Sequence, residues 1–189
     1  MMIGKALTDI FKDKTKVKRE AAFIAMERHA GCREGGKGYP CRAIRTKEYL
    51  YIRNFDPDRW PSGSPERKHC VRHIRYGEVD PSPTKTVMMD EPKYAKLADL
   101  AFGKRPAEEL YLISNDPHQL RNLADAKEFQ KTRDLLRQQL DDHLKKSGDP
   151  RLTGKPALWD YYPFYRAPKF PGWKVAPMPA EFQKAHKVK

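Results

Sequence analysis

The chain has 189 residues, of which 39% are hydrophobic, and 16 prolines against 11 glycines, a composition that predicts one core smaller than the chain. Its 38 basic and 25 acidic residues leave a formal net charge of +13, which favours polyanions such as nucleic acid, anionic membrane or sulfated polysaccharide without choosing among them. No apolar run reaches the roughly 18 residues of a membrane-spanning helix, and residues 1–19 contain no apolar segment of a secretory signal. The sequence therefore predicts no membrane span and no export signal.

Residues 21–54 predict three strands and a loop. The connector 12–19 (KDKTKVKR) is polar and exposed, and residues 21–26 (AAFIAM) have the length and composition of a buried strand. Four glycines and Pro40 require a loop over residues 27–40. Residues 42–45 and 49–54 are rich in aromatic and β-branched side chains and predict a β-hairpin.

The rest of the chain predicts a long loop, two helices and a strand. Residues 56–83 hold five prolines and little periodicity, which indicates a surface loop. A short helix is expected over residues 94–101 and a strand over 109–113. A longer amphipathic helix follows, with Asp125 as its N-cap, Glu128 as the capping-box partner and Gly148 with Pro150 at its end. Its apolar stripe comprises Phe129, Leu136, Leu140 and Leu144, supported by Leu135.

These elements predict an α+β fold, in which a small antiparallel sheet of about four strands is covered by the C-terminal amphipathic helix. Residues 1–20 are interpreted as a connector, residues 21–150 as one subdomain, and residues 151–189 as an extended tail rich in proline and aromatic residues.

The cysteines carry no clear signal. Cys32, Cys41 and Cys70 form neither a C-x-x-C pair nor an even set of disulfide partners, so they predict neither a metal site nor a redox compartment. His69 and His73 flank Cys70, but there is no second Cys/His pair, and a solvated loop is favoured over a zinc site.

No common catalytic signature is present: the sequence lacks a G-x-S-x-G elbow, a glycine-rich phosphate loop and an H-E-x-x-H helix. The best candidate site is the glycine-rich loop after the first strand, where Arg28, His29 and Arg33 can hold a sulfate, phosphate or carboxylate. The alternative is a solvated loop whose charges pair with one another. Tyr39 and Arg42 are weaker candidates, because arginines that alternate along an antiparallel strand often form its solvent face.

Several stretches together resemble the C-terminal subdomain of sulfatases of the heparan N-sulfatase (N-sulfoglucosamine sulfohydrolase) type. The stretches are residues 27–29 (ERH), 38–46 (GYPCRAIRT), 49–55 (YLYIRNF), 57–63 (PDRWPSG) and 108–124 (EELYLISNDPHQLRNLA). The resemblance implies a four-stranded antiparallel subdomain that follows an alkaline-phosphatase-like catalytic domain. Residues 3–7 (IGKAL) resemble a passage near the end of that domain, so residues 1–20 are expected to connect to a catalytic domain missing from the chain.

The family's chemistry relies on a formylglycine made from C-x-P-x-R or S-x-P-x-R and on calcium held by Asp and Asn, all in the upstream domain. The nearest imitation, residues 41–45 (CRAIR), has Ala43 where the motif needs proline, and we reject Cys41 as the nucleophile. We therefore expect no catalytic residue, metal ligand or cofactor in this chain, with calcium and formylglycine confined to the missing domain.

The resemblance predicts a C-terminal fragment of a sulfatase that hydrolyses sulfate esters or N-sulfates of sulfated sugars. Arg28, His29, Tyr39 and Arg42 are its candidate substrate-binding residues, and the partner is the missing N-terminal domain, on a separate chain if the enzyme is split. Family members are usually exported. Two alternatives remain: a basic nucleic-acid-binding module, disfavoured because no binding motif is recognised, and a non-catalytic remnant scaffold.

Overall fold

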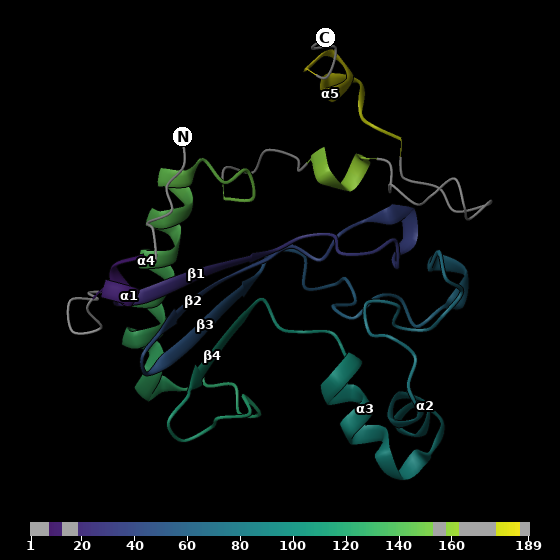
Figure 1. The fold of residues 1–189 in the computed structure, drawn as a ribbon, viewed down its shortest axis with the longest axis horizontal. Helices are drawn as coiled ribbons and strands as arrows, with labels where there is room; N and C mark the ends of the chain where they lie inside the picture. The colour runs from purple at the N-terminus through teal and green to yellow at the C-terminus, as the bar shows by residue number, and fades with distance from the viewer. Residues whose placement is uncertain (1–7, 13–18, 153–157, 163–176, 186–189) are drawn as a thin grey trace. The chain divides into compact units, whose positions relative to one another are not determined.

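The computed structural model describes residues 8–12, 19–152, 158–162 and 177–185 (Figure 1). The chain forms two compact units built from alternating segments. The sheet unit comprises Met1–Ile24, Arg42–Arg53 and Glu109–Gly154, and the loop unit comprises Ala25–Cys41, Asn54–Glu108 and Lys155–Lys189. The assignment of residues 21–150 to one subdomain stays a prediction, and residues 3–7 lie outside the described part of the chain.

Four antiparallel strands form one sheet in the order β1-β2-β3-β4, which confirms the α+β class (Figure 1). The strands are β1 (Ala21–Met26), β2 (Cys41–Thr46), β3 (Tyr49–Asn54) and β4 (Glu108–Leu112). The β2–β3 turn has two residues, Lys47 and Glu48, and the Thr46 hydroxyl accepts a hydrogen bond of 3.0 Å from the Tyr49 amide. The predicted hairpin is therefore confirmed, with a shorter turn than expected.

Helix α4 (Gln130–Ser147) packs on the sheet with Leu136, Leu140 and Leu144 buried. Its beginning and its stripe differ from the prediction. Phe129 is the N-cap residue and makes no side-chain capping bond, so the capping box at Asp125 and Glu128 is wrong. Residues 127–129 form a 3-10 turn that takes the place of this box.

Two further features of α4 concern Leu135 and the end of the helix. Leu135 is 58% exposed, because it stands one position, about 100°, from the buried stripe, so its assignment to the stripe is wrong. The helix ends at Gly148 as predicted: this residue has φ 71° and its amide bonds to the Leu144 and Lys145 carbonyls.

The two faces of β3 are set by α4. Arg53 donates a hydrogen bond of 2.8 Å to Asp141 of α4, so Tyr51, on the same face of the strand, also faces the helix and is buried. Leu50 and Ile52 occupy the opposite face and are only half-buried. The Tyr51 ring and the apolar stem of the Arg53 side chain thus fill the interface under α4.

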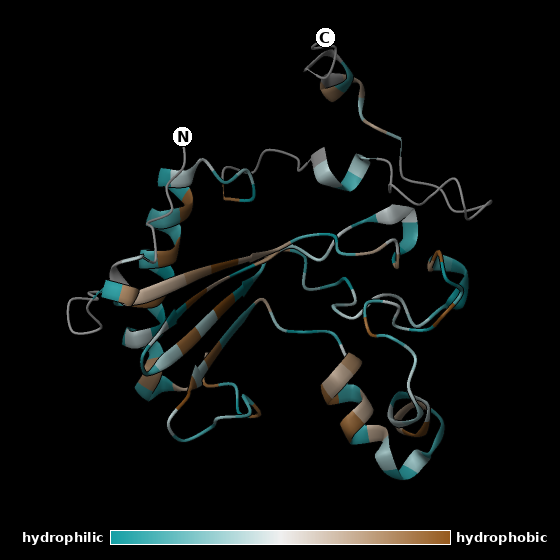
Figure 2. Cartoon of the chain, in the orientation of Figure 1, coloured by the Kyte–Doolittle hydropathy of each residue, from teal (hydrophilic) through white to brown (hydrophobic). Residues whose placement is uncertain are grey.

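Strand β1 is an edge strand and not a buried one, which corrects the expectation from its apolar composition. Phe23, Ile24 and Met26 are 40%, 50% and 41% exposed. Figure 2 shows this apolar ribbon at the edge of the sheet. A strand with a neighbour on one side alone leaves side chains uncovered that a central strand would bury.

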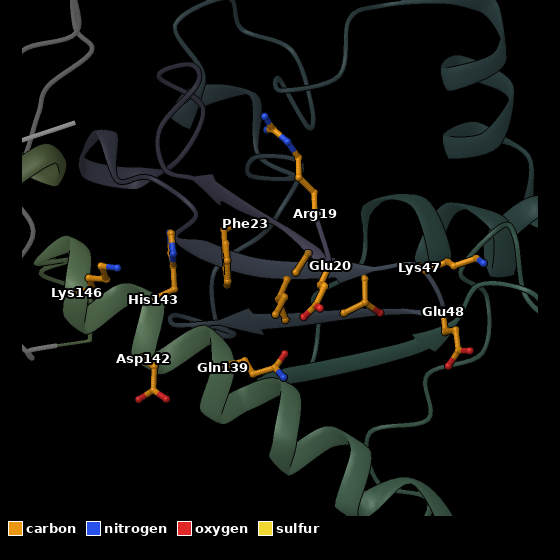
Figure 3. Close-up of a pocket in the computed structure, with 12 residues that line it drawn as sticks. Arg19, Glu20, Phe23, Lys47, Glu48, Gln139, Asp142, His143 and Lys146 are labelled. Atoms are coloured by element: carbon orange, nitrogen blue, oxygen red, sulfur yellow. The ribbon is translucent and has the colours of Figure 1, made fainter. Parts of the chain in front are cut away.

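Phe23 is partly covered by a histidine of α4. The Phe23 and His143 rings stack at 3.7 Å between centroids with an angle of 3° between their planes. Figure 3 shows the two rings side by side at the rim of an open pocket. Burial lowers the pKa of His143 below its ordinary value of 6.5, and the nearby Lys146 charge lowers it further.

Acidification below about pH 6.5 is expected to destabilise the chain through His143. The unfolded state takes up the proton at the ordinary pKa of about 6.5, whereas the folded state takes it up only at lower pH. The contribution of the neutral ring is therefore complete above pH 6.5 and decreases as the pH falls through this window. Urea unfolding between pH 7 and pH 5 measures the effect.

The substitution His143→Gln should remove this part of the pH dependence, because glutamine does not titrate. His118→Gln is the matched control, since it makes the same substitution at an exposed histidine. An identical slope in wild type and His143→Gln would contradict the prediction.

The loop unit contains two helices, α2 (Pro83–Asp90) and α3 (Ala95–Phe102). The sequence analysis missed α2, whose signals are Ser82 as the N-cap and Pro83 in the first turn. The other short helices are α1 (Thr8–Lys12), α5 (Ala180–Ala185) and the 3-10 turns η2 (Glu34–Gly36), η3 (Arg67–His69), η4 (Pro92–Tyr94), η5 (Lys127–Phe129) and η6 (Leu158–Tyr161). Among the described residues, no helix has the length and apolarity to cross a bilayer.

Candidate anion-binding site

The loop between β1 and β2, residues 27–40, folds back on itself in the loop unit. The Tyr39 amide donates to the Glu27 carbonyl at 3.2 Å, and the Arg28 guanidinium donates to the Gly36 carbonyl at 3.0 Å. Gly38 lies where the two ends of the loop cross, and a Cβ at this position would stand 3.0 Å from the backbone nitrogen of Arg28. Contacts within the loop therefore contribute to its shape.

A segment of the tail ties this crossing to a second loop. Asp160 accepts hydrogen bonds from the Gly38 amide at 2.8 Å and from Arg59 at 3.1 Å, and Arg59 also donates to the Gly38 carbonyl at 3.0 Å. Burial lowers the pKa of Arg28, and the Asp160 carboxylate opposes this effect. The Asp160 carboxylate thus joins its own segment to two distant parts of the chain.

His29 is held by a network that the sequence analysis did not foresee. Its Nδ1 lies 2.8 Å from a carboxylate oxygen of Glu78, and the other oxygen accepts a hydrogen bond of 2.9 Å from Arg33. Arg33 also donates to the carbonyls of Trp60 and Pro61, at 2.7 and 2.6 Å. The His29 side chain is 77% exposed. In the doubly protonated ring both nitrogens donate, Nδ1 to Glu78 and Nε2 to an anionic ligand.

An open pocket of about 470 Å³ lies between the two loops of this unit. Its polar lining mixes both signs of charge and comprises Arg33, Glu34, Lys37, Asp58, Arg59, Ser64, Glu66 and His69, with Trp60 beside them. Cations can bind a sulfate group, while carboxylates can accept hydrogen bonds from sugar hydroxyls. This lining suits a polar ligand with one anionic group better than a polyanion.

The cations of the pocket differ in how strongly they are already engaged. Arg33 is buried and pairs with Glu78, and Arg59 pairs with Asp56 and Asp160 at 3.1 Å each. Lys37 is exposed on the loop that carries His29. Lys37 is therefore the cation of the pocket best placed to meet a ligand from solvent, and the exposed His29 lies on the same loop.

Of the four residues predicted to bind substrate, three belong to this loop and one does not. Arg28 and Tyr39 are used within the loop: Arg28 bonds to its backbone, and the Tyr39 ring is buried with the Arg33 guanidinium 5.8 Å from its centre. Arg42 belongs to the sheet unit and is 2% exposed, with Nε and Nη2 donating to Asp149 at 2.7 and 3.3 Å. Their roles in substrate binding stay predictions.

Trp60 has packing partners in the loop unit. Its ring lies edge-on to Tyr76 at 6.0 Å and carries the Lys104 ammonium at 5.5 Å. This arrangement favours the interpretation of Trp60 as a packing anchor over a stacking platform for sugars.

Two observations concern the nucleophile and the metal of the family that the sequence resembles. Cys41 begins strand β2, where the chain is extended. Within the described ranges no three His, Cys, Asp or Glu side chains gather to hold a metal ion.

A second pocket of about 850 Å³ lies in the sheet unit (Figure 3). Strand β1, the β2–β3 turn and α4 line it, and Lys47, Glu48, Asp142 and Lys146 project around it. The sequence analysis did not predict this pocket. Lys47, which lines it, serves below as a control for Lys37 of the first pocket.

Comparisons with known proteins found similarity to a sulfatase. No family model matches the chain. The chain is 30% identical over 111 residues to an ulvan-active sulfatase of Formosa agariphila, a match that covers 57% of this chain and 17% of that protein. The chain is thus related in sequence to a sulfatase and spans less than a fifth of this relative.

One solved structure covers a larger part of the chain at lower similarity. It shows a protein in complex with its substrate, D-glucosamine-2-N,6-O-disulfate, and it is 16% identical, with a TM-score of 0.37. The match covers 70% of this chain and 17% of that one.

Proposed function

We propose that this chain is the C-terminal part of a sulfatase that hydrolyses sulfated sugars, and that the loop carrying Arg28 and His29 forms one wall of the substrate pocket. The single observation that carries the proposal is the 30% identity over 111 residues to the ulvan-active sulfatase. The N-sulfatase-like motifs in residues 38–46 and 57–63 favour a substrate with a sulfated amino sugar. The nucleophile and the calcium ligands belong, in this proposal, to a catalytic domain outside the chain.

The geometry of the loop unit supports a binding role. Glu78 orients His29 and leaves the exposed edge of its ring toward solvent, and Lys37 is exposed on the same loop. The neighbouring pocket of about 470 Å³ has the carboxylates and the serine that sugar hydroxyls require. In this arrangement His29 and Lys37 bind the sulfate, Arg28 holds the shape of the loop, and Glu34 and Asp58 accept hydrogen bonds from the sugar.

The double substitution His29→Ala with Lys37→Ala should weaken binding of a sulfated disaccharide about tenfold. Two partly exposed contacts to one sulfate, at roughly 0.7 kcal/mol each, add up to about 1.4 kcal/mol, which is a factor of ten. Isothermal titration of the full chain with the sulfated disaccharide and with its desulfated form measures the effect. The desulfated sugar should bind the wild-type chain about as weakly as the sulfated sugar binds the variant.

The matched control is His118→Ala with Lys47→Ala, which removes the same two side-chain types from exposed positions of the sheet unit. Equal weakening by both double variants would indicate attraction to net charge alone and would overturn the proposed site. Tight, salt-sensitive binding to duplex DNA, with no preference for sulfated sugar, would instead favour the nucleic-acid-binding alternative. Sulfate release by the isolated chain would contradict the placement of the nucleophile elsewhere.

A further inference from the structure

Two cysteines far apart in the sequence meet in the core of the loop unit. Cys32 lies in the loop after β1, and Cys70 follows the 3-10 turn η3, yet their sulfur atoms are 3.4 Å apart. Their side chains are 0% and 1% exposed, so both thiols are in the interior. Cys41, the third cysteine, is half-buried on strand β2.

The backbone on both sides of the thiols is already aligned. The Val71 amide donates to the Gly31 carbonyl at 2.9 Å, and the Ser64 amide donates to the Cys32 carbonyl at 2.7 Å. A covalent bond needs the sulfur atoms to approach to about 2.05 Å, that is, by somewhat more than an ångström. Rotation of the two side chains can supply this movement while the backbone bonds stay in place.

Glycine makes room for the sulfur atoms. A Cβ on Gly77 would stand 2.4 Å from the Cys70 sulfur and 2.6 Å from the Cys32 sulfur, so any other residue would collide with the pair. Lys85 holds the backbone around this glycine, because its ammonium donates to the carbonyls of Tyr76 and Val79 at 2.8 and 2.7 Å. The loop is therefore fixed against the two sulfurs.

We propose that Cys32 and Cys70 are a modification site: they form a disulfide that joins the loop after β1 to the loop after η3, while Cys41 takes no part in the bond. The oxidant is a disulfide donor, either a protein disulfide or oxidised glutathione. The link closes a loop between residues 32 and 70 and fastens the segment that begins with Arg28 and His29 to the segment that precedes Glu78.

The electron balance is that of thiol–disulfide exchange. The Cys70 thiolate attacks one sulfur of the donor, the donor's S–S bond breaks, and one donor thiolate leaves. The Cys32 thiol then loses its proton and attacks the Cys70 sulfur of the mixed disulfide, which releases the second donor thiolate. Two electrons and two protons pass to the donor, which leaves as two thiols.

While the two cysteines are in contact, their environment makes Cys70 the more acidic thiol. The hydrogen bond from the Cys32 thiol lowers the pKa of Cys70, against the opposing effect of burial, and backbone amides of Arg72 and Ile74 lower it further. The same hydrogen bond and burial raise the pKa of Cys32. Because both sulfur atoms are buried, exchange takes place while the loop unit folds or opens locally.

The test is a count of free thiols in the full chain after exposure to a glutathione redox buffer. The chain has three cysteines, and we expect one thiol to react in denaturant after oxidation and all three after reduction. Peptide mapping by mass spectrometry should place the bond between Cys32 and Cys70. Reduction should lower the Tm of the oxidised chain by about 10 °C, since the closed loop restricts the unfolded state.

Single substitutions to serine separate the cysteines. Cys41→Ser should keep both the bond and the Tm shift, whereas Cys32→Ser and Cys70→Ser should each abolish the shift. Three free thiols after oxidation, a bond that includes Cys41, or a bond between chains would overturn the proposal. The wild-type measurements decide the matter even if a serine variant does not fold.

Discussion

Replacing Arg42 with alanine is expected to lower the free energy of unfolding by about 3–5 kcal/mol. The buried guanidinium donates two hydrogen bonds to Asp149, and its loss leaves that carboxylate, 13% exposed, without its charge partner. Asp149 follows the cap of α4 at Gly148 and also accepts a hydrogen bond from the Arg151 amide. Urea denaturation of the wild-type and Arg42→Ala chains measures the difference.

The control for Arg42 is a second arginine of the same sheet. Arg53 pairs with Asp141 at 2.8 Å, but the two side chains are 32% and 21% exposed. Solvent screens this pair, so Arg53→Ala should cost about 1 kcal/mol or less. A loss of sulfated-sugar binding with unchanged stability in Arg42→Ala would contradict the structural role and restore Arg42 as a binding residue.

Replacing Lys85 with methionine is expected to lower the free energy of unfolding by about 3 kcal/mol. Lys85 is buried, and its ammonium donates to the carbonyls of Arg75, Tyr76 and Val79 at 2.6, 2.8 and 2.7 Å. Methionine keeps the stem of the side chain but leaves these carbonyls without the donor. Thermal unfolding followed by circular dichroism measures the loss.

Lys93→Met is the matched control, because Lys93 is an exposed lysine of the same unit that pairs with Glu91 at 2.8 Å. It should change stability by about 0.5 kcal/mol or less. If Lys85→Met has an equally small effect, the three carbonyls are satisfied by solvent and the loop around Gly77 does not depend on Lys85. In that case the loop would also hold the Cys32–Cys70 pair less firmly than we infer.

Local patterns in the sequence were enough to predict most regular elements. The hairpin, strand β4 and the end of α4 follow from alternation, turn residues and the position of Gly148, all of which act within a few residues. The loop at residues 27–40 was also predicted, because its glycines exclude regular structure. The loop that carries the candidate site was therefore predicted, whereas its contacts were not, and its role in binding stays a prediction.

The features that the sequence analysis missed depend on contacts between distant segments. Glu78 reaches His29 across 49 positions, and Cys32 meets Cys70 across 38. The capping box at Asp125 failed because a 3-10 turn moves the start of α4 to Gln130. Such outcomes depend on how the loops close, and spacing along the chain carries no signal for them.

The loop carrying Arg28 and His29 illustrates what the sequence determines and what only the tertiary structure determines. The sequence by itself determined that the segment is a loop, that it is cationic, and that the surrounding motifs resemble those of a sulfatase, since glycine content, charge and motif are properties of neighbouring residues. Only the tertiary structure decided that Glu78 orients His29, that Arg42 is buried against Asp149, and that Cys32 lies beside Cys70. Hydrogen bonds and buried pairs join atoms a few ångströms apart in space, and packing alone determines which distant residues come within that range.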